Sequence, residues 1–84
     1  MSYRLQIKPS AEKELQAIAQ TVRQRIQRAI RKLGDDPRPP GARKLANRPE
    51  WRLRVGQYRI IYAIDDASQT IDIVKIGHRR DVYH

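Results

Sequence analysis

The chain has 84 residues, which is enough for one small domain with a single core, and we expect residues 1–84 to form that one domain. Eighteen lysines and arginines against nine acidic residues give a formal net charge of +9, which favours polyanionic partners such as nucleic acid. Cysteine is absent, so disulfides and thiolate metal sites are excluded. No segment resembles a signal peptide or a membrane span, and we therefore expect a cytoplasmic protein without a membrane partner.

The N-terminal half of the chain predicts one strand and two helices. Tyr3, Leu5 and Ile7 alternate with polar residues, as in a half-buried strand. Pro9 and Ser10 are expected to end this strand, with Ser10 as the N-cap of the first helix. The apolar residues that follow recur at helical spacing: Ala11, Leu15 and Ile18 in the first helix, then Val22, Ile26, Ala29, Ile30 and Leu33 in a second helix that begins near Thr21.

The C-terminal half predicts strands. Gly34 ends the second helix, and residues 35–41, which contain three prolines, form a loop. Residues 51–55, 57–64 and 70–76 have strand character, and Gly77 is expected to end the last strand. Helices segregated from a three-strand antiparallel meander predict an α+β fold, with both helices packed on one face of the sheet.

Three arginines are predicted to share the other face of the sheet. Arg52 and Arg54 are two residues apart in one strand, and Arg59 follows in the next strand, beyond a turn at Gly56 and Gln57. We expect them to be exposed there and to bind phosphate groups. By contrast, we interpret three arginines of the second helix as an ordinary solvated surface: Arg23, Arg28 and Arg31.

The aromatic and histidine residues indicate neither a base-stacking platform nor a metal site. Trp51, Tyr58 and Tyr62 alternate out of phase with the arginines, so we assign them to the core. His78 and His84 are the only histidines, and no spaced carboxylates accompany them. We therefore expect no metal and no other cofactor.

Two segments of the chain resemble one known family. Residues 51–62 (WRLRVGQYRIIY) and 75–83 (KIGHRRDVY) are similar to the RelE branch of the RelE/ParE toxin superfamily, and the helix pair, the proline-rich loop and Lys44-Leu45 match as well. The resemblance implies a small RelE-like fold and the toxin component of a type II toxin–antitoxin system. It also implies an endoribonuclease that enters the ribosomal A site and cuts messenger RNA there, without a metal.

The resemblance also assigns roles to individual residues. Arg52 and Arg54 occupy the places of two basic cleft residues that are often lysines, and Arg59 matches the arginine of a Gly-x-Tyr-Arg segment. Arg79 matches the arginine after the last strand, and Tyr83 matches a tyrosine that stacks on a base beside the cut. Four further residues are expected to contact RNA: Arg43, Lys44, His78 and Arg80.

The chemistry implied is attack of a ribose 2′-OH on the adjacent phosphorus, with loss of the 5′-oxygen. Arg59 and Arg79 suit stabilisation of the phosphorane, because a guanidinium stays charged and binds phosphate oxygens in pairs. Arg52 and Arg54 stand where relatives often carry lysine, and arginine cannot give up its proton to act as a base. The general base therefore remains open among five residues: Lys44, Glu50, His78, Tyr83 and His84.

The resemblance implies an acidic, RelB-like antitoxin that folds on binding, and operator DNA bound only through the toxin–antitoxin complex, which represses the operon. Two alternatives stay open. A ParE-like protein would inhibit DNA gyrase instead of cutting RNA. A non-catalytic basic module would bind RNA or the ribosome and leave the messenger intact.

Overall fold

The computed structural model describes residues 2–78, which fold into five strands and two helices. The predicted order of one strand, two helices and a strand meander is confirmed. One strand was not predicted: β2 has only two residues, too few to show an alternating pattern. In chain order the elements are β1 (Arg4–Ile7), α1 (Pro9–Gln16), α2 (Gln20–Leu33), β2 (Arg43–Lys44), β3 (Trp51–Val55), β4 (Tyr58–Asp65) and β5 (Thr70–His78).

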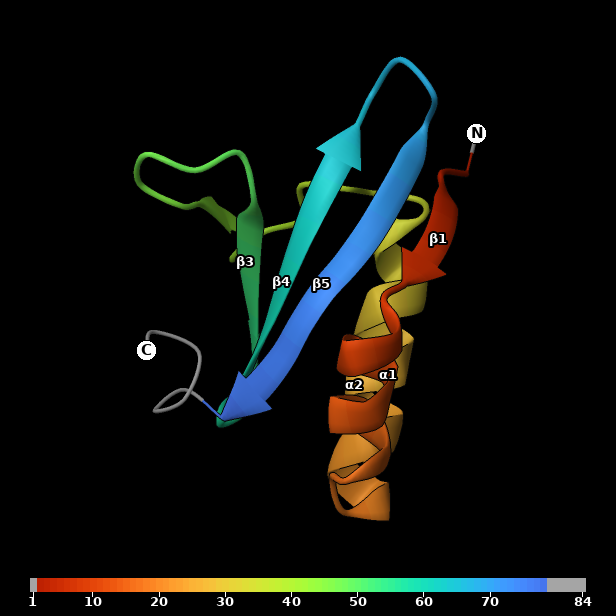
Figure 1. Cartoon of the computed structure of the whole chain (residues 1–84), viewed down its shortest axis with the longest axis vertical. Coiled ribbons are helices and arrows are strands. Elements are labelled where there is room, and N and C mark those ends of the chain that lie inside the picture. The colour runs from red at the N-terminus through yellow and green to blue at the C-terminus, as the bar shows by residue number, and fades with distance from the viewer. Residues whose placement is uncertain (1, 79–84) are drawn as a thin grey trace.

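The five strands form one mixed sheet in the order β1-β5-β4-β3-β2 (Figure 1). β2 to β5 are antiparallel neighbours, whereas β1 pairs with β5 in parallel. Both helices lie in the connection between β1 and β2 and cover the same face of the sheet, as predicted. Among residues 2–78, no helix covers the opposite face of β2, β3 and β4.

The first helix begins two residues earlier than predicted. Pro9 is its first residue and Lys8 precedes it, so Ser10 lies inside the helix and is not the N-cap. Proline is suited to this position because its fixed φ is helical and the first turn leaves its N–H groups unbonded in any case. The break after β1 thus comes from Pro9, as expected, but without a capping side chain.

Gly34 ends α2, as predicted. A left-handed backbone conformation is not the reason why glycine is needed at this position. Its φ is −60°, within the range that any residue adopts. The N-terminal strand approaches so closely that the Tyr3 N–H donates to the Gly34 carbonyl at 2.7 Å. A Cβ at position 34 would lie 3.2 Å from the Arg31 carbonyl oxygen and 3.4 Å from that of Tyr3. Glycine is needed here for close packing of two backbones.

The last strand is longer than predicted. β5 continues through Gly77 to His78, and Gly77 pairs with Arg59 in the ladder, one pair before Tyr58 with His78. The expectation that Gly77 ends the strand was wrong, because the ladder with β4 continues past it.

The core lies between the sheet and the helices. Most of the predicted apolar positions are buried there, while Val22 and Ala29 are half-buried against it. Trp51 and Tyr58 also pack against this core, and Tyr62 is fully buried in it, so their predicted assignment is confirmed. Neither α1 nor α2, the helices found in residues 2–78, has the length and apolar character needed to cross a bilayer.

Candidate nucleic-acid interface

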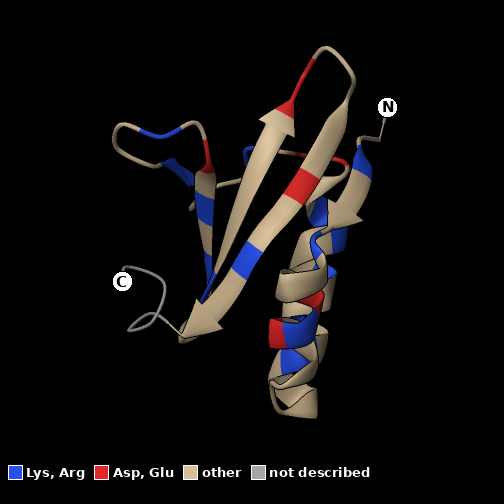
Figure 2. Cartoon of the chain, in the orientation of Figure 1, with Lys and Arg blue, Asp and Glu red and all other residues tan. Residues whose placement is uncertain are grey.

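Four arginines lie on the helix-free face of the sheet, and we call them the arginine face. Residues that oppose each other in an antiparallel ladder point to the same side. Arg54 opposes Arg59 across β3 and β4, and Arg43 opposes Arg52 across β2 and β3. Since Arg52 and Arg54 are two residues apart in one strand, all four side chains share one side. Figure 2 shows the basic residues gathered on β2, β3 and the loop between them.

The four arginines differ in exposure. Arg43 and Arg54 are exposed and Arg52 is half-buried, but only 7% of Arg59 is accessible. The prediction that Arg59 is an exposed residue was therefore wrong. Its strand, β4, has a neighbouring strand on both sides. The arginine face thus combines one buried, immobilised cation with more accessible ones.

The β3–β4 turn sets this register. Gly56 and Gln57 form a two-residue turn, as predicted, and Gly56 has a φ of +59°, which tight hairpin turns require and glycine adopts without strain. A slip of one residue would move Arg54 to the opposite face of the sheet. The turn therefore fixes which arginines meet.

The arginine face places like charges next to one another. Two cross-strand pairs bring arginine opposite arginine, and like charges directly opposite each other in a ladder are unfavourable when no counter-charge is near. Such an arrangement is favourable when an anion lies between the cations, and guanidinium groups bind phosphate oxygens in bidentate geometry. Chemically, the face can hold a phosphate group and stabilise additional negative charge on it.

Two of the predicted RNA-binding residues do not join the arginine face. Lys44 opposes Trp51, whose side chain packs on the core, so Lys44 belongs to the other side of the sheet. His78 opposes Tyr58 on that same side, and their rings meet edge to face with centroids 5.6 Å apart. Three further candidates, Arg79, Arg80 and Tyr83, lie outside the described residues, as does His84.

The remaining base candidates are also placed. Glu50 forms an ion pair with Arg48 at 3.2 Å in the loop before β3, and Lys44 is exposed. Neither belongs to the strand positions that form the arginine face. Within residues 2–78, no group of three or more His, Asp or Glu side chains is arranged to hold a metal ion.

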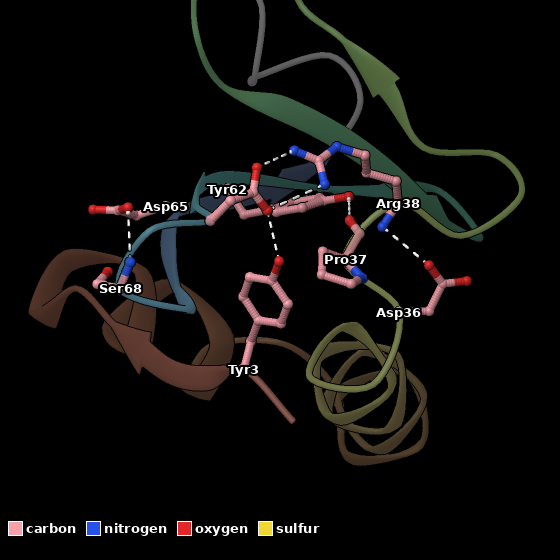
Figure 3. A network of polar contacts seen from close by, with 8 residues as sticks. Tyr3, Asp36, Pro37, Arg38, Tyr62, Asp65 and Ser68 are labelled. Carbon is pink, nitrogen blue, oxygen red and sulfur yellow. Dashed lines mark hydrogen bonds and ion pairs between the residues drawn. The ribbon is translucent and has the colours of Figure 1, made fainter. Parts of the chain in front are cut away.

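A polar network that sequence patterns did not indicate joins three distant segments (Figure 3). Arg38, in the proline-rich loop, forms an ion pair with Asp66 at 2.9 Å, and Tyr3 donates to the same carboxylate at 2.6 Å. The Arg38 guanidinium also lies over the Trp51 ring, 5.3 Å from its centroid. These bonds from Arg38 and Tyr3 hold the pKa of Asp66 below its usual value. The network anchors the loop that leads into β2 and the arginine face.

A buried tyrosine also holds the proline-rich loop in place through a hydrogen bond. Tyr62 is fully buried, and its hydroxyl donates to the Pro37 carbonyl oxygen at 2.8 Å (Figure 3). Burial raises the pKa of Tyr62 to about 12. The loop is thus attached at two consecutive residues, Pro37 and Arg38, to β4 and to the β4–β5 turn.

On the helix side, an open apolar groove runs between β1 and the two helices. Its volume is about 290 Å³. Leu5, Ile7, Leu15 and Ile30 supply its apolar walls, together with Glu12, Gln27 and Arg31. This groove and the arginine face lie on opposite sides of the sheet, so two different ligands could occupy them.

Comparison with known proteins gives a consistent result over nearly the whole chain. Residues 5–83 match the family model of the ParE toxin of type II toxin–antitoxin systems, parDE. A RelE-like toxin protein of Escherichia coli is 28% identical over 88 residues, a match that covers 100% of this chain and 93% of that protein. Toxin RelG of Mycobacterium tuberculosis is 41% identical over 44 residues, 52% of this chain and 48% of that toxin.

Among solved structures, the archaeal RelE–RelB complex from Pyrococcus horikoshii OT3 contains a similar chain. The TM-score is 0.85 at 27% identity, and the match covers 98% of this chain and 100% of that one. The strand order and the position of the helix pair in the present structure therefore belong to a known fold.

Proposed function

This chain belongs to the RelE/ParE superfamily, the toxins of type II toxin–antitoxin systems, and from that premise we propose that it is a messenger RNA endoribonuclease acting on the ribosome. The observation that carries this proposal is the pair of opposed arginines, Arg54 and Arg59, one exposed and one buried, on the helix-free face. A protein that only needed a soluble surface would gain nothing from placing like charges in one ladder.

The residues of the arginine face would act on the scissile phosphate. Arg59, held rigidly by burial, would bind a non-bridging oxygen and stabilise the charge that develops when the 2′-oxygen attacks the phosphorus. Arg52 and Arg54 would position the flanking phosphates and add to the positive field. In this proposal Arg79 assists Arg59, Tyr83 stacks on a base beside the cut, and the group that accepts the 2′ proton is left open.

Primer extension on a translated messenger after induced expression tests this proposal. The wild-type protein should produce cuts at defined codon positions. Arg54→Gln should remove most of them, because it deletes an exposed cation of the arginine face without opening a cavity. Arg59→Lys keeps the buried charge but loses the bidentate geometry, so cleavage should fall there as well.

Arg4→Gln is the matched control for Arg54→Gln. Arg4 is also an exposed strand arginine, but β1 is separated from β3 by two strands, which alone places the two positions at least about 14 Å apart. Cleavage should persist in Arg4→Gln. An intact messenger during growth arrest by the wild-type protein would contradict the endoribonuclease proposal.

The family match favours gyrase inhibition as the second candidate, because the matched model is that of the ParE toxin. A gyrase inhibitor needs no phosphate cleft, so Arg54→Gln would then leave growth arrest unchanged. Supercoiling by purified gyrase in the presence of the protein separates the two candidates. Inhibition of gyrase together with intact messenger would move the assignment to this second function.

We also propose that an acidic RelB-like antitoxin neutralises this toxin and represses the shared operon with it. Support comes from the Pyrococcus horikoshii relative, which was crystallised with RelB. The apolar groove beside β1 offers a surface of the kind that a folding segment covers on binding. Leu5→Glu, at a half-buried wall of this groove, should abolish co-purification with the product of a neighbouring acidic reading frame.

A further inference from the structure

Helix α2 carries a cluster of basic residues that belongs neither to the core nor to the arginine face. From Leu15 to Gly34 the chain contains no acidic residue. Within the same stretch lie five basic residues: Arg23, Arg25, Arg28, Arg31 and Lys32. Arg23 has a local structural role, because its Nη1 donates to the Gln16 carbonyl oxygen at the end of α1 at 3.3 Å. The other four are exposed.

Three of the exposed cations form a stripe along the helix, and we call Arg25, Arg28 and Lys32 the α2 stripe. With 3.6 residues per turn they fall within about 60° of the helix circumference and extend over about 10 Å. No ion pair joins any of the three to an acidic residue within the described part of the chain. Their charge is therefore available to a partner.

The α2 stripe lies next to the turn that leads to the arginine face. A Cβ placed on Gly56 would lie 3.6 Å from Nη1 of Arg25, so this guanidinium reaches the β3–β4 turn. Arg54 precedes that turn by only two residues. Positive charge thus continues from α2, round the end of the sheet, to the opposite face, and one polyanion could follow it.

The composition of the α2 stripe favours a nucleic acid over a protein partner. Its exposed neighbours, Thr21 and Gln24, are polar, so the surface offers no apolar centre. Protein interfaces bury such a centre and are depleted in charge there, whereas nucleic-acid interfaces are polar and strongly positive. The apolar groove beside β1 is better suited to a protein segment than the α2 stripe is.

We propose that the α2 stripe binds the phosphate backbone of a folded RNA, as a contact separate from the arginine face. The occupant would be duplex RNA, because three cations aligned on a straight helix match a rigid row of phosphates better than a flexible strand. Recognition would be independent of sequence, since guanidinium and ammonium groups on phosphate read no base edges. This binding does not depend on whether the protein cleaves RNA.

Salt-dependent binding of an RNA hairpin tests the proposal. The probe is a hairpin with a stem of about 16 base pairs, and its affinity is measured over a series of KCl concentrations. In the variant Arg25→Gln/Arg28→Gln/Lys32→Gln, the slope of log affinity against log salt should become shallower by about 2 to 3, because each phosphate contact contributes about 0.9. Affinity at low salt should fall by about tenfold or more.

A control variant with the same loss of charge separates a local contact from net charge. Arg4→Gln/Lys8→Gln/Lys13→Gln also removes three exposed cations, which lie on β1, immediately before α1 and in the last turn of α1. Its salt slope should stay close to that of the wild type. Arg25→Lys/Arg28→Lys, which keeps both charges, should retain most of the affinity.

Two outcomes would overturn the proposal. Equal loss of affinity in the stripe variant and in the control variant would mean that only net charge matters. Wild-type RNA binding by the stripe variant, together with loss of binding to a poly-glutamate peptide, would assign the surface to an acidic protein. Unfolding midpoints equal to that of the wild type show that the variants are folded, and cleavage is not needed as a readout.

Discussion

Gly77 lies directly across the β4–β5 ladder from Arg59, so the buried guanidinium has a neighbour without a side chain. Opposed residues in an antiparallel ladder have Cβ atoms about 5 Å apart on the same face. A larger residue at position 77 would compete with Arg59 for this space. The glycine that was expected to end the strand is thus the cross-strand neighbour of the cation.

Gly77→Val is therefore expected to reduce the proposed cleavage by at least about tenfold, because it displaces the Arg59 guanidinium. Gly77→Ala should have a smaller effect of the same sign. Ala63→Val is the control, since Ala63 is also a small residue of β4 but opposes Asp72, away from Arg59. Cleavage on purified translating ribosomes is the measurement, and wild-type rates in Gly77→Val would contradict the displacement.

Removal of an exposed arginine from the arginine face should not lower stability. Arg54→Gln relieves repulsion with Arg59, so the free energy of unfolding should stay the same or rise by about 0.2–1 kcal/mol. Arg4→Gln, where the opposed residue is Thr70, should change it little. Urea denaturation measures both variants. A loss of stability specific to Arg54→Gln would show that Arg54 supports the fold and does not serve only a ligand.

Most of the fold was predictable because local patterns report which face of an element is buried. Strand alternation and helical spacing identified β1, the two helices and the meander before any contact was known. The parallel pairing of β1 with β5 carries no local signal, since it joins residues 66 positions apart, as in Arg4 with Thr70. β2 is visible only through its pairing with β3.

The candidate site was predictable in part. The spacing of Arg52 and Arg54 indicated one face, and the turn at Gly56 indicated the strand that carries Arg59. Arg59 is opposed by Gly77, 18 residues later, and the anchoring of Arg38 depends on Asp66, 28 residues later. Such relations arise from tertiary packing, and no periodic pattern in the sequence reports them.

The Tyr62 hydroxyl should make stability sensitive to alkaline pH. Burial raises the pKa of Tyr62 to about 12, above its ordinary value of 10.0. The unfolded chain then loses this proton first, so the stabilisation is complete below pH 10 and is lost as the pH rises towards 12. In Tyr62→Phe this part of the decline should disappear, and the hydrogen bond to Pro37 is lost at a cost of about 1 kcal/mol at neutral pH. Urea denaturation at a series of pH values compares the two proteins. If the free energy of unfolding falls in parallel with rising pH for the wild type and Tyr62→Phe, the Tyr62 hydroxyl does not cause this decline.

Asp66 should contribute at the opposite end of the pH scale. Hydrogen bonds from Arg38 and Tyr3 lower the pKa of Asp66 below its ordinary 3.8, so its stabilisation is present above that value and is lost as the pH falls below it. Asp66→Asn should therefore unfold at a lower temperature than the wild type at pH 7, and the difference should shrink in acid. Asp65→Asn is the matched control, because the Asp65 carboxylate accepts only a local bond, from the Ser68 N–H. If the difference in unfolding temperature between the wild type and Asp66→Asn does not depend on pH, the ionised Asp66 carboxylate is not its cause.

The Glu14 carboxylate supplies a hydrogen-bond acceptor at the exposed edge of β5. β1 ends at Ile7, opposite Ile73, so the rest of β5 has no strand beside it on that edge within the described residues. There Oε1 of Glu14 accepts the Ile76 N–H at 3.1 Å, and Oε2 pairs with Lys75 Nζ at 2.9 Å. A helix side chain thus takes the place of a strand carbonyl.

Glu14→Ala and Glu14→Gln should consequently differ. Alanine removes the acceptor and should cost about 1–3 kcal/mol, because the Ile76 N–H loses its partner. Glutamine keeps a carbonyl oxygen for that N–H and loses only the partly exposed ion pair, which contributes about 1 kcal/mol or less.

Hydrogen exchange at the Ile76 amide should be much faster in Glu14→Ala and near the wild-type rate in Glu14→Gln. Lys75→Met, which removes the ion pair from the other side, should match Glu14→Gln in stability. Equal exchange rates in the alanine and glutamine variants would mean that β5 is held at this edge by packing against α1 and not by the carboxylate.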